Sequence, residues 1–156
     1  MNVAFTEILL GLLALLLVIA AAIDVRTYTI SNRLNLAVAL LAPLFWWSVA
    51  LPVWPGVALQ LAVAAAVFVL LALAFYAGMM GGGDVKLAAA VALWLAPPDT
   101  LRFLVFMSLA GGVLTVALLI AHRLRSRPGR PEIPYGVAIA VGALAILAQR
   151  FLNQFA

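Results

Sequence analysis

Apolar segments close to the length that crosses a lipid bilayer follow one another along almost the whole chain, and they limit its possible folds more than any other feature. Hydrophobic residues make up 68% of the 156 residues, and charged residues only 9%. A water-soluble domain has too small an interior to bury that much apolar surface, so the sequence predicts an integral membrane protein. No polar stretch is long enough for a second unit, and we expect one polytopic domain over residues 1–156.

We expect an all-α fold with six transmembrane helices, because about 20 apolar residues cross a bilayer as a helix. The expected segments are Phe5–Ile23, Leu34–Val49, Val57–Gly78, Val85–Ala96, Leu101–Ala121 and Tyr135–Leu152. Pro43 is expected to kink the second segment. No basic residue precedes the first segment, so we expect a retained span and not a signal peptide.

Basic residues predict the orientation, since cytoplasmic loops carry an excess of Lys and Arg. Seven of the nine basic residues lie in connections after odd-numbered segments, namely Arg26, Arg33, Lys86, Arg123, Arg125, Arg127 and Arg130. This pattern places those connections in the cytoplasm and both termini outside. The four tryptophans fall at the outer ends of the segments, where we expect them at the membrane interface.

The composition also excludes several kinds of site. The chain has no cysteine and a single histidine, His122, so disulfides, thiolate metal sites and histidine-rich metal sites are excluded. The serines have no histidine within the membrane to activate them. The basic residues are scattered at segment ends and form no nucleic-acid-binding patch, so the lipid bilayer is the partner they indicate. We expect no metal and no cofactor.

Two aspartates, Asp24 and Asp84, are expected at the same membrane face, where an acid is costly and therefore suggests function. Counting about 1.5 Å per residue from Pro97 puts Asp84 roughly 10 Å below the cytoplasmic surface. Asp84 closes a glycine run, Gly81–Gly83, where we expect non-helical backbone lining a hydrated pocket. The structural alternatives are an interfacial acid for Asp24 and a helix N-cap for Asp84.

Two carboxyl groups that share one proton can hydrolyse a peptide bond. The ionised group activates water, and the protonated group polarises the scissile carbonyl. Asp84 begins a helix and Asp24 ends one, and a helix dipole favours negative charge at the N-terminus. From the sequence we therefore expect Asp84 to be the base and Asp24 the protonated partner.

Three motifs resemble those of the type IV prepilin peptidases. The run from Gly81 to Lys86, GGGDVK, resembles the GxGDxK element of that family. The run from Asp24 to Asn32 resembles its other aspartate motif, with Ser31 where proline is usual. Ile133-Pro134-Tyr135-Gly136 resembles the short element that opens the last helix of the family.

The resemblance implies a GxGD-type aspartic protease of the bacterial inner membrane, which removes the leader of prepilins or pseudopilins at the cytoplasmic face. It implies that Asp24 and Asp84 are the catalytic pair. We expect a supporting substrate pocket formed by Gly81, Gly82, Gly83, Lys86 and Asn32. The chain has no cysteine-containing insert, so it resembles the short form associated with Flp (tight-adherence) pili, and methylation of the product is not expected.

Other readings of the two acids remain open. A presenilin-like or signal-peptide-peptidase-like protease shares the chemistry, but such proteases usually have more spans and a Tyr-Asp pair, and Ile23 precedes Asp24 here. A small ion-coupled transporter or channel subunit would use the acids as a proton relay. A non-enzymatic assembly subunit would not need two buried acids. These residues do not identify a particular pilin or an oligomeric state.

Overall fold

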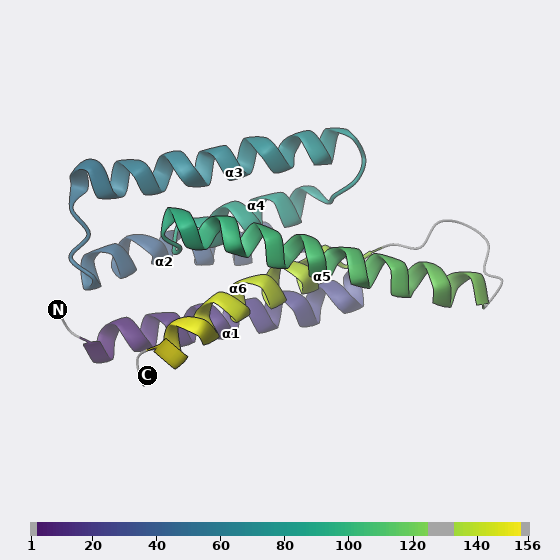
Figure 1. Cartoon of the computed structure of the whole chain (residues 1–156), viewed down its shortest axis with the longest axis horizontal. Coiled ribbons are helices and arrows are strands. Elements are labelled where there is room, and N and C mark those ends of the chain that lie inside the picture. Colours follow the sequence, from purple (N-terminus) through teal and green to yellow (C-terminus); the bar gives the residue numbers. More distant parts are fainter. Residues whose placement is uncertain (1–2, 125–132, 154–156) are drawn as a thin grey trace.

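The computed structural model describes residues 3–124 and 133–153 of the chain, and they fold into a helical bundle (Figure 1). The α-helices are α1 (Val3–Thr27), α2 (Asn32–Ser48), α3 (Ala58–Tyr76), α4 (Gly82–Ala92), α5 (Pro97–Leu124) and α6 (Tyr135–Asn153). A short π-helical turn, η1 (Val53–Val57), leads into α3. The prediction of an all-helical protein with six α-helices is therefore confirmed for the described part of the chain.

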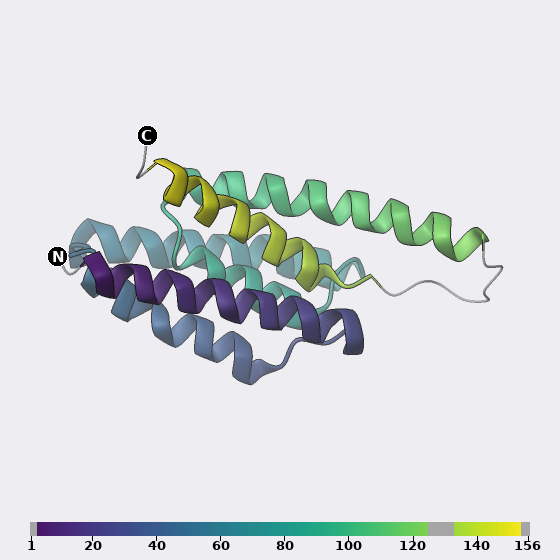
Figure 2. The ribbon, with the colours of Figure 1, turned by 90° about the horizontal axis from the view of Figure 1, so that it is seen from below.

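The helices pack so that segments distant in sequence become neighbours. Helix α6 lies between α1 and α5, and α2 joins α1 to α4 (Figures 1 and 2). Helix α1 begins and α6 ends at one end of the bundle. The end of α1, the start of α4 and the start of α6 lie at the opposite end, beyond which α5 continues. The three sequence motifs are therefore located at one end of the bundle.

Helix α4 is the short central helix of this arrangement. It packs against α2, α3 and α6, and most of its residues are buried. At about 1.5 Å per residue, its 11 residues extend for roughly 16 Å, about half the thickness of a hydrocarbon core. The expected segment Val85–Ala96 therefore starts earlier, at Gly82, and stops earlier, at Ala92, than the sequence indicated.

Side chains from neighbouring helices satisfy the buried carbonyl groups where α4 ends. The side-chain amide of Gln60 on α3 donates to the carbonyl oxygens of Ala92 and Leu93 at 3.3 and 3.1 Å, and also to that of Leu95. The indole Nε1 of Trp46 donates to the carbonyl oxygen of Leu93 at 2.7 Å. Helix ends leave carbonyl groups unpaired, and burial of such groups is costly, so these donors allow α4 to end inside the protein.

Within the described residues, four helical segments are long and apolar enough to cross a membrane, namely Val3–Thr27, Val53–Tyr76, Pro97–Leu124 and Tyr135–Asn153. The chain is thus a multi-pass membrane protein. Helix α2, with 17 residues, falls just short of the usual length, and α4 falls well short. The expectation of six spans is not confirmed, because α2 and α4 are shorter than a helix that usually crosses a membrane.

Trp94 departs from the expected membrane interface. Its side chain is only 2% exposed, stacks on Phe45 with ring centroids 5.2 Å apart, and donates from Nε1 to the carbonyl oxygen of Val38 at 3.0 Å. It therefore packs in the core between α2 and α4.

Three of the basic residues used for orientation, Arg125, Arg127 and Arg130, lie outside the described residues.

Candidate active site at the shared end of three helices

Asp24 lies in the last turn of α1 and is 2% exposed. Its backbone carbonyl accepts a hydrogen bond from the amide of Tyr28, so the helix continues for less than one turn beyond it. Its side-chain Oδ2 accepts a hydrogen bond of 2.6 Å from the backbone N–H of Gly136, at the start of α6. Asp24 is therefore not an exposed interfacial acid but a buried group held by a distant helix.

Asp84 is the third residue of α4 and is 8% exposed. The N-cap of this helix is Gly81, with extended backbone, whereas Gly82 and Gly83 are already helical. The expectation of non-helical backbone through all three glycines is wrong for the last two, and the alternative of Asp84 as the N-cap is wrong as well. The Asp84 side chain turns back toward the N-cap, so that its Oδ2 lies beside Gly81.

The glycines allow close approach of other groups. A Cβ atom on Gly81 would lie 2.8 Å from Oδ2 of Asp84, and one on Gly83 would lie 2.8 Å from the carbonyl oxygen of Ile30. Real Cβ atoms do not come that near to such oxygens. The glycine run therefore lets the start of α4 approach the connection between α1 and α2, which carries Ile30.

Ile30 is the link between the two aspartates. It is buried, contacts Gly83 before Asp84, and contacts Gly136, whose amide binds Asp24. The two carboxyl groups are near enough for the charge on Asp24 to act on Asp84. The structure thus brings together the two acids, which are 60 positions apart in the sequence numbering.

Asn35 belongs to this site although sequence analysis did not select it. It is 5% exposed, and its Nδ2 donates to the carbonyl oxygen of Gly83 at 2.9 Å. Among the described residues, Asn35 Oδ1 and Asp84 Oδ1 are the two buried side-chain atoms without a hydrogen-bond partner. A signal was available, because Asn35 is an amide within an apolar segment, where polar residues are expensive.

Lys86 and Asn32 lie on the exposed side of the same region. The Lys86 ammonium donates to Oδ1 of Asn32 at 2.9 Å, which ties α4 to the start of α2. Lys86 is exposed and Asp84 is buried, as expected for residues two apart on a helix. These two side chains are therefore near the glycine run without being part of the buried acid pair.

Ser31 performs a defined structural role in place of the usual proline. It is the N-cap of α2, and its Oγ accepts a hydrogen bond from the amide of Leu34 at 3.3 Å. Its φ angle of −70° is close to the value that a proline ring imposes. The local turn geometry is thus compatible with either residue, and serine adds a cap to the helix.

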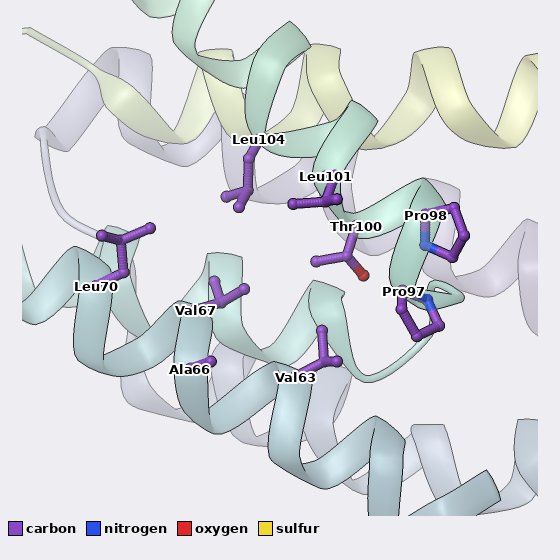
Figure 3. A pocket seen from close by; sticks show the side chains of 9 residues that line it. All are labelled: Val63, Ala66, Val67, Leu70, Pro97, Pro98, Thr100, Leu101 and Leu104. Atoms are coloured by element: carbon purple, nitrogen blue, oxygen red, sulfur yellow. The ribbon is translucent and has the colours of Figure 1, made fainter.

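Two grooves of similar size differ in their relation to the acids. A groove of about 450 Å³ between α2, α3 and α4 is apolar apart from three polar side chains, those of Asn32, Asn35 and Lys86. A groove of about 500 Å³ between α3 and α5 is lined by aliphatic side chains, two prolines and Thr100, with no titratable group (Figure 3). We call them the α2–α4 groove and the α3–α5 groove. Of these two grooves, only the α2–α4 groove is lined by Asn35, which contacts Gly83 at the start of α4.

The arrangement provides two buried carboxyl groups and few other reactive groups. Within residues 3–124 and 133–153, no cluster of three or more His, Cys, Asp or Glu side chains could hold a metal ion. Two neighbouring carboxyl groups in a weakly hydrated site favour a shared proton, because both cannot ionise at low cost. In such a pair, the ionised group can activate water and the protonated group can polarise a carbonyl group.

The model of the type IV leader peptidase family matches residues 11–116, which include both aspartates and the glycine run. No curated protein and no solved structure matches the chain.

Proposed function

This chain belongs to the type IV leader peptidase family, and from that premise we propose that it is a membrane-embedded aspartic endopeptidase that removes the leader of prepilins or pseudopilins. Asp24 and Asp84 are the catalytic pair in this proposal. One carboxylate activates a water molecule, and the other, protonated, donates to the carbonyl oxygen of the scissile bond.

The observation that carries the proposal is that Ile30 packs against both Gly83, the residue before Asp84, and Gly136, whose amide binds Asp24. Through its contacts with Gly83 and Gly136, Ile30 connects the start of α4 to the start of α6. Both carboxyl groups are buried, and the charge on one acts on the other. Two structural acids would have no reason to be buried together, because each makes burial of the other more costly.

A prepilin-like substrate has a basic leader, a cleavage point and then an apolar helix. The α2–α4 groove provides an apolar surface for the segment after the cleavage point, and its polar side chains Asn32 and Lys86 lie beside the start of α4. In this arrangement the apolar helix remains in a lipid-like environment while the cleavage point reaches the carboxyl pair.

We place the reaction at the cytoplasmic face of the bacterial inner membrane. Seven of the nine basic residues lie in connections at the acid-containing end of the predicted topology, in line with the excess of Lys and Arg in cytoplasmic loops. The chain lacks cysteine and a long polar insert, which supports the short form that serves Flp pili and cleaves without methylating its product.

The proposal is tested with purified protein in liposomes and a prepilin-like substrate that carries a basic leader. We expect release of the leader by the wild-type protein and none by Asp24→Ala or Asp84→Ala. Unchanged cleavage by either variant would exclude the carboxyl pair. Absence of cleavage by the wild-type protein, together with proton flux that either substitution abolishes, would instead support the ion-coupled transporter.

A further inference from the structure

The start of α6 makes the most specific contact with the acid pair. We propose that the backbone N–H of Gly136 positions Asp24 as the ionised base of the reaction, and that residue 136 must be glycine for this contact to form. Gly136 is then a positioning residue that acts through Asp24. The assignment of Asp24 as the base rests on the proposed function, but the contact between Gly136 and Asp24 can be tested without a cleavage assay.

The hydrogen bond has the geometry of a strong, charge-assisted contact. The amide nitrogen of Gly136 lies 2.6 Å from Oδ2 of Asp24, and both residues are buried. The amide belongs to the first turn of α6, where N–H groups have no carbonyl partner within the helix. Pro134, just before the helix, has no N–H group of its own, so the first available donors are those that follow it.

The absence of a side chain at position 136 is required by the same contact. A Cβ atom there would lie 2.8 Å from Oδ2 and 3.0 Å from Cβ of Asp24, and 2.7 Å from Cδ1 of Ile30. Any other residue at this position would push the carboxyl group away from the amide. Since Gly136 is the second residue of α6, the need for glycine comes from packing against Asp24 and Ile30 and not from an unusual backbone angle.

The contact assigns different roles to the two acids. A backbone N–H can only donate, so it favours an Asp24 oxygen that accepts, and the positive end of the α6 dipole favours negative charge there. The end of α1 acts in the opposite sense but has no direct contact of this kind with the carboxyl group. In Asp84, Oδ2 lies beside the backbone of Gly81 at the cap of its own helix, and Oδ1 has no hydrogen-bond partner among the described residues. Asp24 is therefore the base and Asp84 the protonated partner, the reverse of the order expected from helix ends alone.

The decisive test deletes the donor without adding volume. Replacement of Gly136 by glycolic acid during synthesis converts the amide into an ester and removes the N–H group. We expect the infrared carboxylate stretch of Asp24, isolated as the difference between wild type and Asp24→Asn, to shift, and kcat to fall by about 100-fold with little change in KM, since a misplaced catalytic group has a cost of that order. An unchanged carboxylate stretch would overturn the proposal whether or not the protein cleaves prepilins.

Gly136→Ala provides the second test, with a rescue and a matched control. We expect Gly136→Ala to shift the infrared carboxylate band of Asp24 and to lower kcat. Both effects should persist when Gly136→Ala is combined with Ile30→Val, a substitution that removes Cδ1 of Ile30. Recovery of kcat in the double variant would attribute the loss to crowding of Ile30 and contradict the proposal. Gly142→Ala, whose Cβ would lie 2.9 Å from the amide nitrogen of Met107, perturbs the packing of α6 elsewhere and should leave the Asp24 band unchanged.

Discussion

The side-chain amide of Asn35 donates a hydrogen bond of 2.9 Å to the carbonyl oxygen of Gly83, the residue before Asp84. This contact joins α2 to the first turn of α4 across 48 positions of sequence. The position of Asp84 therefore depends on a polar side chain from another helix as well as on the glycine run. In a membrane protein, such an interhelical bond fixes one helix against another where apolar packing alone is weakly specific.

Replacement of Asn35 by leucine should distinguish the effect of the hydrogen bond to Gly83 from the effect of burying the side chain, because the two side chains are similar in size. We expect the free energy of unfolding to fall by about 1–3 kcal/mol as the Gly83 carbonyl loses its donor. We also expect kcat to fall, because Asp84 is no longer held. Thermal unfolding in detergent and a cleavage assay measure the two effects. Asn153→Leu, at the exposed end of α6, is the control, and an equal loss of stability in that variant would contradict the role of Asn35.

Gly83→Ala tests the close approach of α4 to the segment after α1. The added Cβ would lie 2.8 Å from the backbone oxygen of Ile30, which cannot move as a flexible side chain could. We expect a loss of about 1–3 kcal/mol in stability, as for other overpacked sites, and a loss of cleavage. Gly112→Ala, with no atom within 4 Å of the new Cβ, should behave as wild type. Wild-type cleavage by Gly83→Ala would show that this close approach is not needed.

The α2–α4 groove makes a separate prediction about substrate binding. Ala89→Phe fills part of this groove, and Ala66→Phe fills part of the α3–α5 groove to a similar extent. If the apolar segment of the substrate lies in the first groove, Ala89→Phe should raise KM by about tenfold, roughly 1.4 kcal/mol of binding, with kcat little changed. Ala66→Phe should leave both parameters unchanged. The opposite result, with KM raised only by Ala66→Phe, would move the substrate to the α3–α5 groove.

Gln60 is predicted to stabilise the internal end of α4. Gln60→Leu removes the donor to the carbonyl oxygens of Ala92, Leu93 and Leu95, which then keep only the Leu95 amide, the Trp46 indole and the Thr100 hydroxyl, respectively. We expect the free energy of unfolding to fall by about 1 kcal/mol, the net contribution of a buried hydrogen bond. Calorimetry of the detergent-solubilised protein measures this change. Stability equal to that of the wild-type protein would mean that water reaches these carbonyl groups.

Periodicity and composition were sufficient to predict the membrane class and the number of α-helices, because long apolar runs have few alternatives in lipid. They placed the end of α4 too late, at Ala96, because the apolar character of the sequence continues to that residue although the helix ends at Ala92. The end of α4 depends on Gln60 and Trp46, which come from other helices. Trp94 was misplaced for a similar reason, because a buried indole with a backbone acceptor has the same sequence pattern as an interfacial one.

The sequence identified the two aspartates but not their surroundings. Local spacing indicates which helix end carries each acid, whereas the donor to Asp24 comes from Gly136, 112 positions away. Dipole reasoning from α1 and α4 alone therefore gave the opposite order of roles from the one we now propose. Asn35 could have been found as a polar residue within an apolar segment. Ile30 has no such signal, because its importance comes only from its neighbours in space.

The most direct measurement of the central claim is the kcat of leader cleavage by Asp24→Asn, Asp84→Asn and the variant with both substitutions, each confirmed as folded by thermal unfolding. If the two acids act together on one water molecule, each single variant should lose at least about 100-fold, and the double variant should be no slower than the slower single variant. Near-wild-type cleavage by either single variant, or losses that multiply in the double variant, would show that Asp24 and Asp84 do not act as one catalytic unit.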